Sequence, residues 1–316
     1  MSDIPIRGNL SDRFLKRLRE RDLRPIIKMI ADDGELDVQV RDNSLNVYYR
    51  GGNILLIKPQ SFQFDKFYFY LGHPKGFPKT HVKKVANGQQ NEINPRTRRP
   101  IPTIDEAQQI MRELDDKLKN LMKLLPDNPQ DFFAKAKSAM DQWFEKWEHQ
   151  ERDDQQAITT RNNCAESESD LAVIDIEFAV SVNKPYNKAK NMDGKNKVCR
   201  FDMIAVDCKG RLYVIELKQN GAADSEDNSA NVAVHKKDFD GTIGNDVNGL
   251  FAKEMAHLVE VKKQLGTLPA SVFVDTTLNP IFAVAYSGEN PEASNEKYRK
   301  EGICVVEVLE DKKLRK

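Results

Sequence analysis

Three charged residues interrupt the two apolar runs of a stretch that otherwise has the pattern of a buried β-hairpin, "RFDMIAVDCKGRLYVIELKQ". They are Asp202, Glu216 and Lys218. Charged groups in the core of a sheet cost several kcal/mol unless they are paired or bind a metal. Their types and spacing therefore indicate either a buried ion pair or a site for chemistry.

The turn "CKG" sets which residues of this hairpin face each other. A three-residue loop with glycine last is a type I turn followed by a left-handed residue. It pairs Asp207 with Arg211, and counting back pairs Asp202 with Glu216, with Lys218 on the same face. A two-residue loop would instead shift the register by one and separate the acids. The other face is predicted to be core: Phe201, Met203, Ala205, Tyr213, Ile215 and Leu217.

Two carboxylates held this close repel each other at neutral pH, and one ammonium only partly offsets the repulsion. A divalent cation removes the conflict. Mg²⁺ prefers oxygen ligands, accepts one or two carboxylates and keeps several waters, one of which can become a nucleophile. The predicted cofactor is therefore Mg²⁺, with Mn²⁺ able to substitute. A salt bridge on the surface of a sheet is the structural alternative.

At these residues the sequence resembles the PD-(D/E)XK nuclease superfamily, which has the restriction-endonuclease-like fold. The motif of that family is an aspartate on one strand and an acid-x-lysine on the next, here Asp202 and "ELK". The order helix, three strands, helix, strand is expected over residues 129 to 287. Phe201 stands where the family usually has proline.

The resemblance implies further site residues. Members often add an acid from the helix before the first strand, for which Glu151 is the candidate and Glu148 the alternative. Glu177 on the strand before Asp202 could reach the same metal or face solvent, and Gln219 follows the motif lysine, where a polar residue commonly assists. Contacts to phosphate or substrate are expected from His235, Lys236 and Asp238.

The implied activity is Mg²⁺-dependent hydrolysis of nucleic-acid phosphodiester bonds by a nuclease, with DNA favoured over RNA, in a defence or repair setting. The alternative is a catalytically inactive module that binds nucleic acid or protein on the same fold. A homodimer through the helices between residues 103 and 158 is compatible with both. The sequence has none of the phosphate-loop, dinucleotide, HExxH or GxSxG motifs.

The expected fold class is α/β (α+β) in three parts. Residues 1–102 form a small α+β domain with a basic loop, residues 103–128 a connecting helix, and residues 129–316 a nuclease-like domain with a mixed sheet. Aromatic residues between 48 and 70 are either core or a base-stacking platform. Phosphate contacts, or merely a solvated loop, are expected at Lys83, Lys84, Arg96, Arg98 and Arg99.

Several helices and strands are expected from the apolar periodicity. One helix follows Thr103, a second begins near Asn128 with a stripe that extends to Ile158, and a third covers "NDVNGLFAKEMAHLVEVKKQL". Strands are expected at "KFYFYLG", "LAVIDIEFAVSV", "IFAVAYS" and "ICVVEVL", and a lysine-rich loop at residues 184–197.

Composition limits the partners. Lysine plus arginine and aspartate plus glutamate number 49 each, so the net charge is zero and any nucleic-acid contact must come from a local patch. No apolar run approaches the roughly 20 residues of a membrane span, and no signal peptide is evident. Four cysteines without CxxC spacing argue against a zinc knuckle or a disulfide framework. A cytoplasmic protein without membrane contact is expected.

Overall fold

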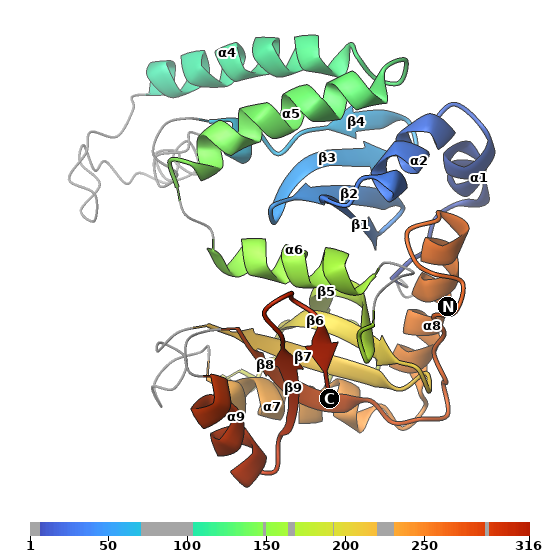
Figure 1. Cartoon of the computed structure of the whole chain (residues 1–316), viewed down its shortest axis with the longest axis vertical. Coiled ribbons are helices and arrows are strands. Elements are labelled where there is room, and N and C mark those ends of the chain that lie inside the picture. Colours follow the sequence, from blue (N-terminus) through green and yellow to red (C-terminus); the bar gives the residue numbers. More distant parts are fainter. Residues whose placement is uncertain are drawn as a thin grey trace. The chain divides into compact units, whose positions relative to one another are not determined.

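The computed structural model describes residues 7–70, 104–147, 150–163, 168–191, 193–219, 231–287 and 291–316. The chain has mixed α and β content and an α+β fold, as expected (Figure 1). It forms two compact units, the first made of Met1–Gly51 and Gln150–Lys316 and the second of Gly52–His149. The boundaries between the units therefore lie after Gly51 and before Gln150, whereas the sequence analysis placed boundaries after residues 102 and 128.

The larger sheet belongs to the first unit and has the strand order β10-β9-β8-β7-β6-β5. Strands β5, β6 and β7 are antiparallel neighbours, β8 and β9 run parallel to β7, and β10 is antiparallel to β9. This is a mixed sheet, as expected. The strands are β5 (Leu171–Val180), β6 (Cys199–Asp207), β7 (Leu212–Lys218), β8 (Ile281–Tyr286), β9 (Cys304–Val308) and β10 (Leu314–Arg315).

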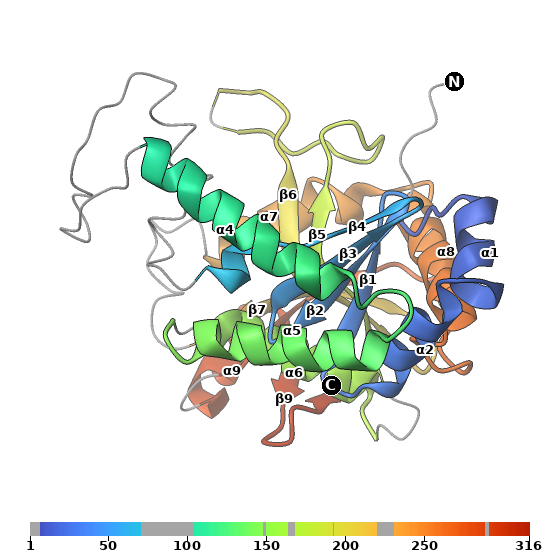
Figure 2. The same cartoon turned by 90° about the horizontal axis from the view of Figure 1, so that it is seen from above.

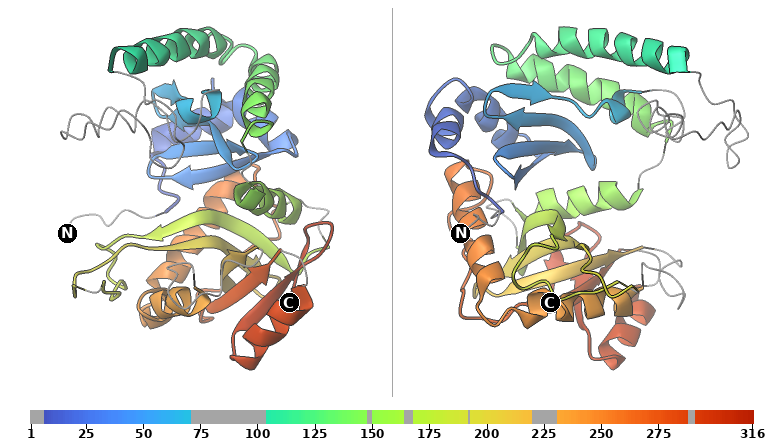
Figure 3. Two further views of the ribbon diagram at one scale, coloured as in Figure 1. Left: turned by 90° about the vertical axis from the view of Figure 1, so that its left-hand side faces the viewer. Right: turned by 180° about the vertical axis from the view of Figure 1, so that it is seen from behind.

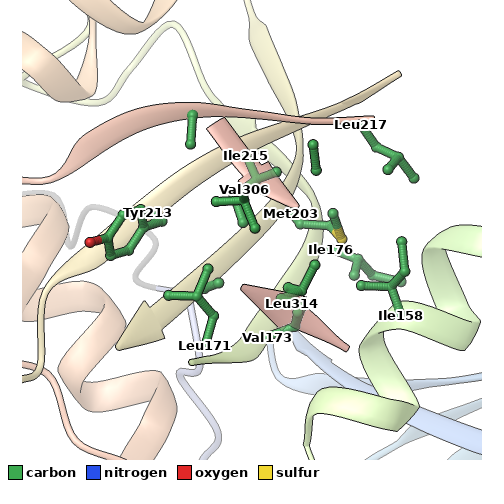
Figure 4. Close-up of a cluster of buried hydrophobic side chains, with 13 residues drawn as sticks. Ile158, Leu171, Val173, Ile176, Met203, Tyr213, Ile215, Leu217, Val306 and Leu314 are labelled. Atoms are coloured by element: carbon green, nitrogen blue, oxygen red, sulfur yellow. The ribbon is translucent and has the colours of Figure 1, made fainter. Parts of the chain in front are cut away.

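Helices cover both faces of this sheet (Figure 3). Helix α6 (Gln150–Asn162) covers one face, where Ile158 joins a cluster of buried side chains from all six strands (Figure 4). Helix α7 (Val232–Asp240) lies on the other face and packs Phe239 against Phe282, with ring centroids 5.7 Å apart. Met203, Ala205, Tyr213, Ile215 and Leu217 lie in the cluster, which confirms the predicted apolar face of the hairpin.

The remaining helices of the C-terminal half are α8 (Leu250–Gln264) and α9 (Pro291–Lys300). Only α8 was predicted, and the prediction of one helix between β7 and β8 is wrong because α7 precedes it. Val232 and Phe239 are the buried apolar residues of α7, which are too few to give an apolar stripe. None of the described helices is long and apolar enough to cross a lipid bilayer.

The N-terminal segment of the first unit contains α1 (Asp12–Glu20), α2 (Arg24–Asp32) and the antiparallel pair β1 (Leu36–Arg41) and β2 (Ser44–Tyr49). A buried ion cluster ties it to the larger sheet. The Asp175 carboxylate on β5 accepts from Arg7 at 2.7 Å and from Arg41 at 2.5 Å. Its side chain is fully buried, so this cluster is one of the contacts that join the N-terminal segment to the C-terminal half.

The second unit contains β3 (Gly52–Lys58), β4 (Ser61–Gln63), a 3₁₀ helix (Lys66–Phe69), α4 (Ile104–Met122) and α5 (Pro129–Phe144). The 3₁₀ helix replaces the strand expected at "KFYFYLG", because its aromatic rings pack against α5: Tyr68 lies 5.1 Å from Trp143 between ring centroids. None of the aromatic residues between 48 and 70 is exposed. Tyr49, Tyr68 and Phe69 are buried and the others half-buried, so these side chains form a core and its rim.

The helix stripe expected to run from Asn128 to Ile158 is interrupted. Helix α5 ends at Phe144 and α6 begins at Gln150. The periodic positions are nevertheless buried on both sides of the interruption, with Met140 and Trp143 in the second unit and Ile158 in the first. The predicted periodicity is therefore right, but the single long helix is wrong.

Candidate active site

The hairpin formed by β6 and β7 has the predicted turn. Gly210 has φ of 80°, and its N–H donates to the Asp207 carbonyl at 2.9 Å. Asp207 in turn donates to the Arg211 carbonyl at 3.1 Å. The predicted register is confirmed, since Val206 pairs with Leu212 and each following pair keeps that sum of residue numbers.

The ladder between the two strands ends at the pair Met203 and Ile215. One residue further, the Asp202 carboxylate accepts a hydrogen bond from the backbone N–H of Leu217 at 2.8 Å. The Gln155 amide on α6 donates to the Asp202 carbonyl at 2.5 Å. Side chains therefore replace the ladder here and fix the position of Asp202.

Glu216 and Lys218 are buried on β7, with 3% and 6% of their surface exposed. The Lys218 ammonium donates to Glu216 Oε1 at 2.8 Å, and His235 Nε2 from α7 lies 3.1 Å from the same oxygen. Glu216 Oε2 is also buried and accepts no hydrogen bond from an N–H group of the described residues, while the Glu216 and Asp202 carboxyl groups lie close enough to hydrogen-bond when one of them is protonated. Two carboxyl groups this close either share a proton or bind a cation.

Burial raises the pKa of Glu216 to about 8, and the negative charge of Asp202 adds to the rise, while the Lys218 ammonium opposes it. Burial also lowers the pKa of His235, as does the charge of Lys218. At neutral pH the Glu216 carboxyl is thus largely protonated and the imidazole neutral. A cation that binds the carboxylate must displace this proton.

The residues present fit the divalent ion that the resemblance implies. No group of three or more His, Cys, Asp or Glu side chains could hold a metal within the described ranges. Mg²⁺ does not need such a group, because it usually binds through one or two carboxylates and keeps its other waters. Asp202 and Glu216 would be those carboxylates, and Glu216 Oε2 is not taken up by any N–H donor of the described residues.

Gln219 is held at the edge of the site by an aspartate that the sequence analysis missed. Its amide donates to the Asp154 carboxylate of α6 at 2.5 Å. Asp154 also accepts from Lys312 at 2.9 Å and from Ser287 at 3.3 Å. The signal for Asp154 was its position three residues after Glu151, which places both on one side of the helix.

The other predicted site residues are distributed as follows. Glu177 is exposed with φ of 51°, and the pairs on either side of it place it opposite Asp202 in the register. Lys236 pairs with Asp240 on an exposed part of α7, and Asp238 pairs with Lys197. Glu151 lies in the first turn of α6, but its side chain is outside the described part. Outside the described residues altogether lie Lys83, Lys84, Arg96, Arg98, Arg99 and Glu148.

No protein-family model, curated protein or solved structure matches this chain. Its relation to the PD-(D/E)XK superfamily therefore stays a hypothesis carried by the residues of the β6–β7 hairpin. The same holds for the assignment of a metal ion to these residues.

Proposed function

We propose that this protein is a metal-dependent nuclease that hydrolyses phosphodiester bonds, with DNA as the favoured substrate. The observation that carries the proposal is the pair of carboxyl groups of Asp202 and the buried Glu216, held side by side next to the Lys218 ammonium. A purely structural ion pair gives no reason to bury a second carboxyl group beside the first, because their charges repel. A metal site does.

The order of elements also supports the proposal. Helix α6, the antiparallel strands β5 to β7, two helices and the parallel strand β8 follow one another. This is the order that the resemblance implies, with α7 as an additional helix. The acids lie on β6 and β7 where the two strands cease to pair.

The residues suggest a division of roles. Asp202 and Glu216 would hold Mg²⁺, which when bound neutralises phosphate charge and lowers the pKa of a bound water. The Lys218 ammonium would orient the attacking water and stabilise charge that develops on the phosphate. Asp154 fixes Gln219, whose amide would assist beside the lysine.

The alternative is an inactive binding module, in which Glu216 stays protonated or paired with Lys218 and no metal binds. One experiment separates the two. The purified protein is incubated with supercoiled plasmid, linear duplex, single-stranded DNA and RNA, in Mg²⁺, Mn²⁺ or EDTA. The test variants are Asp202→Asn and Lys218→Met. The control is Lys209→Met, which removes an exposed ammonium at the turn of the same hairpin.

We expect metal-dependent cleavage by the wild type and the control, a loss of at least about a hundredfold in both test variants, and a folded circular dichroism spectrum for every protein at the assay temperature. Cleavage that survives in Lys218→Met, or that persists in EDTA, would contradict the assignment. Binding of one substrate without turnover by all four proteins would favour the inactive module.

A further inference from the structure

The lysine-rich segment between β5 and β6 is an ordered ribbon. Lys190 and Asn196 form an antiparallel bridge, and Lys197 donates its N–H to the Ala189 carbonyl at 3.2 Å. Asn191 donates to the Lys195 carbonyl at 2.9 Å and closes the tip. Figure 2 shows the segment extending beyond the ends of β5 and β6.

The base of the ribbon is fixed to the first unit. The Asn187 amide donates to the carbonyls of Ser181 at 3.1 Å and Lys197 at 2.9 Å. Lys188 donates its N–H to the Gly241 carbonyl, after α7, at 2.7 Å. Two lysines of the segment are used in ion pairs, Lys184 with Glu254 and Lys197 with Asp238.

Four other cations of this segment and its junction with β6 are exposed, and they pair with no carboxylate of the described residues: Lys188, Lys190, Lys195 and Arg200. We call this set the basic ribbon. Side chains alternate between the two faces along the strand, and this alternation shows which face the set shares. Cys199 and Phe201 are buried, Val198 and Arg200 are exposed, and Asp202 is the next residue on that same face. The exposed face of the ribbon therefore leads into the candidate site.

We propose that the basic ribbon binds the phosphate backbone of the nucleic acid and guides it to Asp202. This inference rests on the proposed nuclease function. From Asn196 to Asp202 the extended strand spans about 20 Å, which matches roughly six phosphates along one strand of a B-form duplex. The cations would supply affinity and register without reading sequence.

The chemistry of the ribbon favours a nucleic acid over an anionic membrane. A membrane-binding segment combines basic residues with apolar side chains that enter the lipid. Among the described residues between β5 and β6, the large apolar side chains that are exposed are Val182 and Val198, and Val198 lies between Asn196 and Arg200 on its face. The row of cations ends at the two acids of the candidate site. This arrangement fits an extended polyanion that binds along the cations and is cut where they end.

The test measures binding without turnover. A labelled DNA duplex is titrated in EDTA over a series of salt concentrations and followed by fluorescence anisotropy. The test variant carries Lys188→Gln, Lys190→Gln, Lys195→Gln and Arg200→Gln. The matched control removes the same charge from exposed positions on α1 and α2, with Arg13→Gln, Lys16→Gln, Arg24→Gln and Lys28→Gln.

We expect the test variant to bind at least about tenfold more weakly, with a salt dependence whose slope falls by about three to four, while the control stays close to wild type. Equal loss in both variants, or no loss in the test variant, would overturn the role of the ribbon. So would ribbon-dependent binding to phosphatidylserine vesicles in place of DNA.

The readouts separate this inference from the nuclease proposal. If the test variant loses binding although the wild type cuts nothing in Mg²⁺ or Mn²⁺, the ribbon stands and the nuclease does not. If the wild type cuts and the test variant binds and cuts equally well, the nuclease stands and the ribbon does not. Circular dichroism of each variant shows whether it is folded.

Discussion

The backbone N–H of Leu217 donates to the carboxylate of Asp202 at 2.8 Å, at the point where the β6–β7 ladder would continue. The Asp202 side chain thus accepts the hydrogen bond that a strand backbone would otherwise accept. This bond holds Asp202 near Glu216, where its negative charge helps to raise the pKa of Glu216. The hydrogen bond and the charge of Asp202 can be removed by different substitutions, so its structural and chemical roles can be tested separately.

Asp202→Asn keeps an oxygen that can accept from Leu217, whereas Asp202→Ala removes it. We expect the free energy of unfolding to change by less than about 1 kcal/mol in the asparagine variant and to fall by about 1–3 kcal/mol in the alanine variant, which leaves the N–H unpaired. Urea titration measures both. Mn²⁺ binding, followed by electron paramagnetic resonance, should weaken in both, and tight binding in either would exclude Asp202 as a ligand.

Glu216 should make stability depend on pH. Its pKa is about 8 in the folded protein and 4.5 as the reference value, so protonation favours the folded state. This contribution is fully present below pH 4.5 and is lost as the pH rises through 8. Glu216→Gln mimics the protonated form, so the variant should keep this contribution to stability as the pH rises.

The difference in unfolding free energy between Glu216→Gln and wild type should therefore grow between these two pH values, by at most about 1.4 kcal/mol per pH unit. Denaturant titrations in EDTA at several pH values measure it. Glu260→Gln on the exposed side of α8 serves as comparison, because water screens that carboxylate. A difference that does not change with pH would mean that Glu216 is charged throughout.

Gly210 should be hard to replace. Its φ is left-handed, and a Cβ there would lie 2.6 Å from the backbone nitrogen of Asp275. Gly210→Ala should cost at least about 2 kcal/mol. Gly194 has a similar φ of 73° but open space around it, so Gly194→Ala should cost only about 1 kcal/mol. Thermal unfolding compares the two, and equal losses would mean that the contact at Asp275 yields.

Asp175 should be essential for stability. Asp175→Asn leaves the guanidinium groups of Arg7 and Arg41 without their buried partner, which should cost about 3–5 kcal/mol. The matched control is Asp153→Asn, which breaks the half-exposed pair with Arg50 and should cost less than about 1 kcal/mol. Urea unfolding measures both, and a loss of similar size in the two variants would show that burial does not strengthen the Asp175 cluster.

The hairpin could be predicted because its information is local. A turn ending in Gly210 fixes the register, and the register fixes which residues share a face with Asp202. No other part of the chain is needed for that inference. The turn fixes the register, and the acid-x-lysine pattern then predicts which of the residues on that face are catalytic.

The rest of the site depends on contacts between distant residues. Asp154 meets Gln219 across 65 positions of sequence, and its spacing from Glu151 indicates a shared side of the helix but not this contact. His235 was expected near the site from the family resemblance, but its helix, α7, has too few buried apolar residues to be predicted. The grouping of the N-terminal segment with the C-terminal half depends on Arg7 and Arg41 meeting Asp175, which no local pattern encodes.

The discontinuous first unit has a consequence for synthesis. On the ribosome, β1 is synthesised long before β5. Arg41 therefore has no buried partner until Asp175, which lies 134 positions later, has been synthesised. During that interval the whole second unit emerges and can fold, since domains generally fold as they appear. The N-terminal segment spends this time without its final partner. We therefore expect the yield of folded protein to depend on translation speed over residues 52–175.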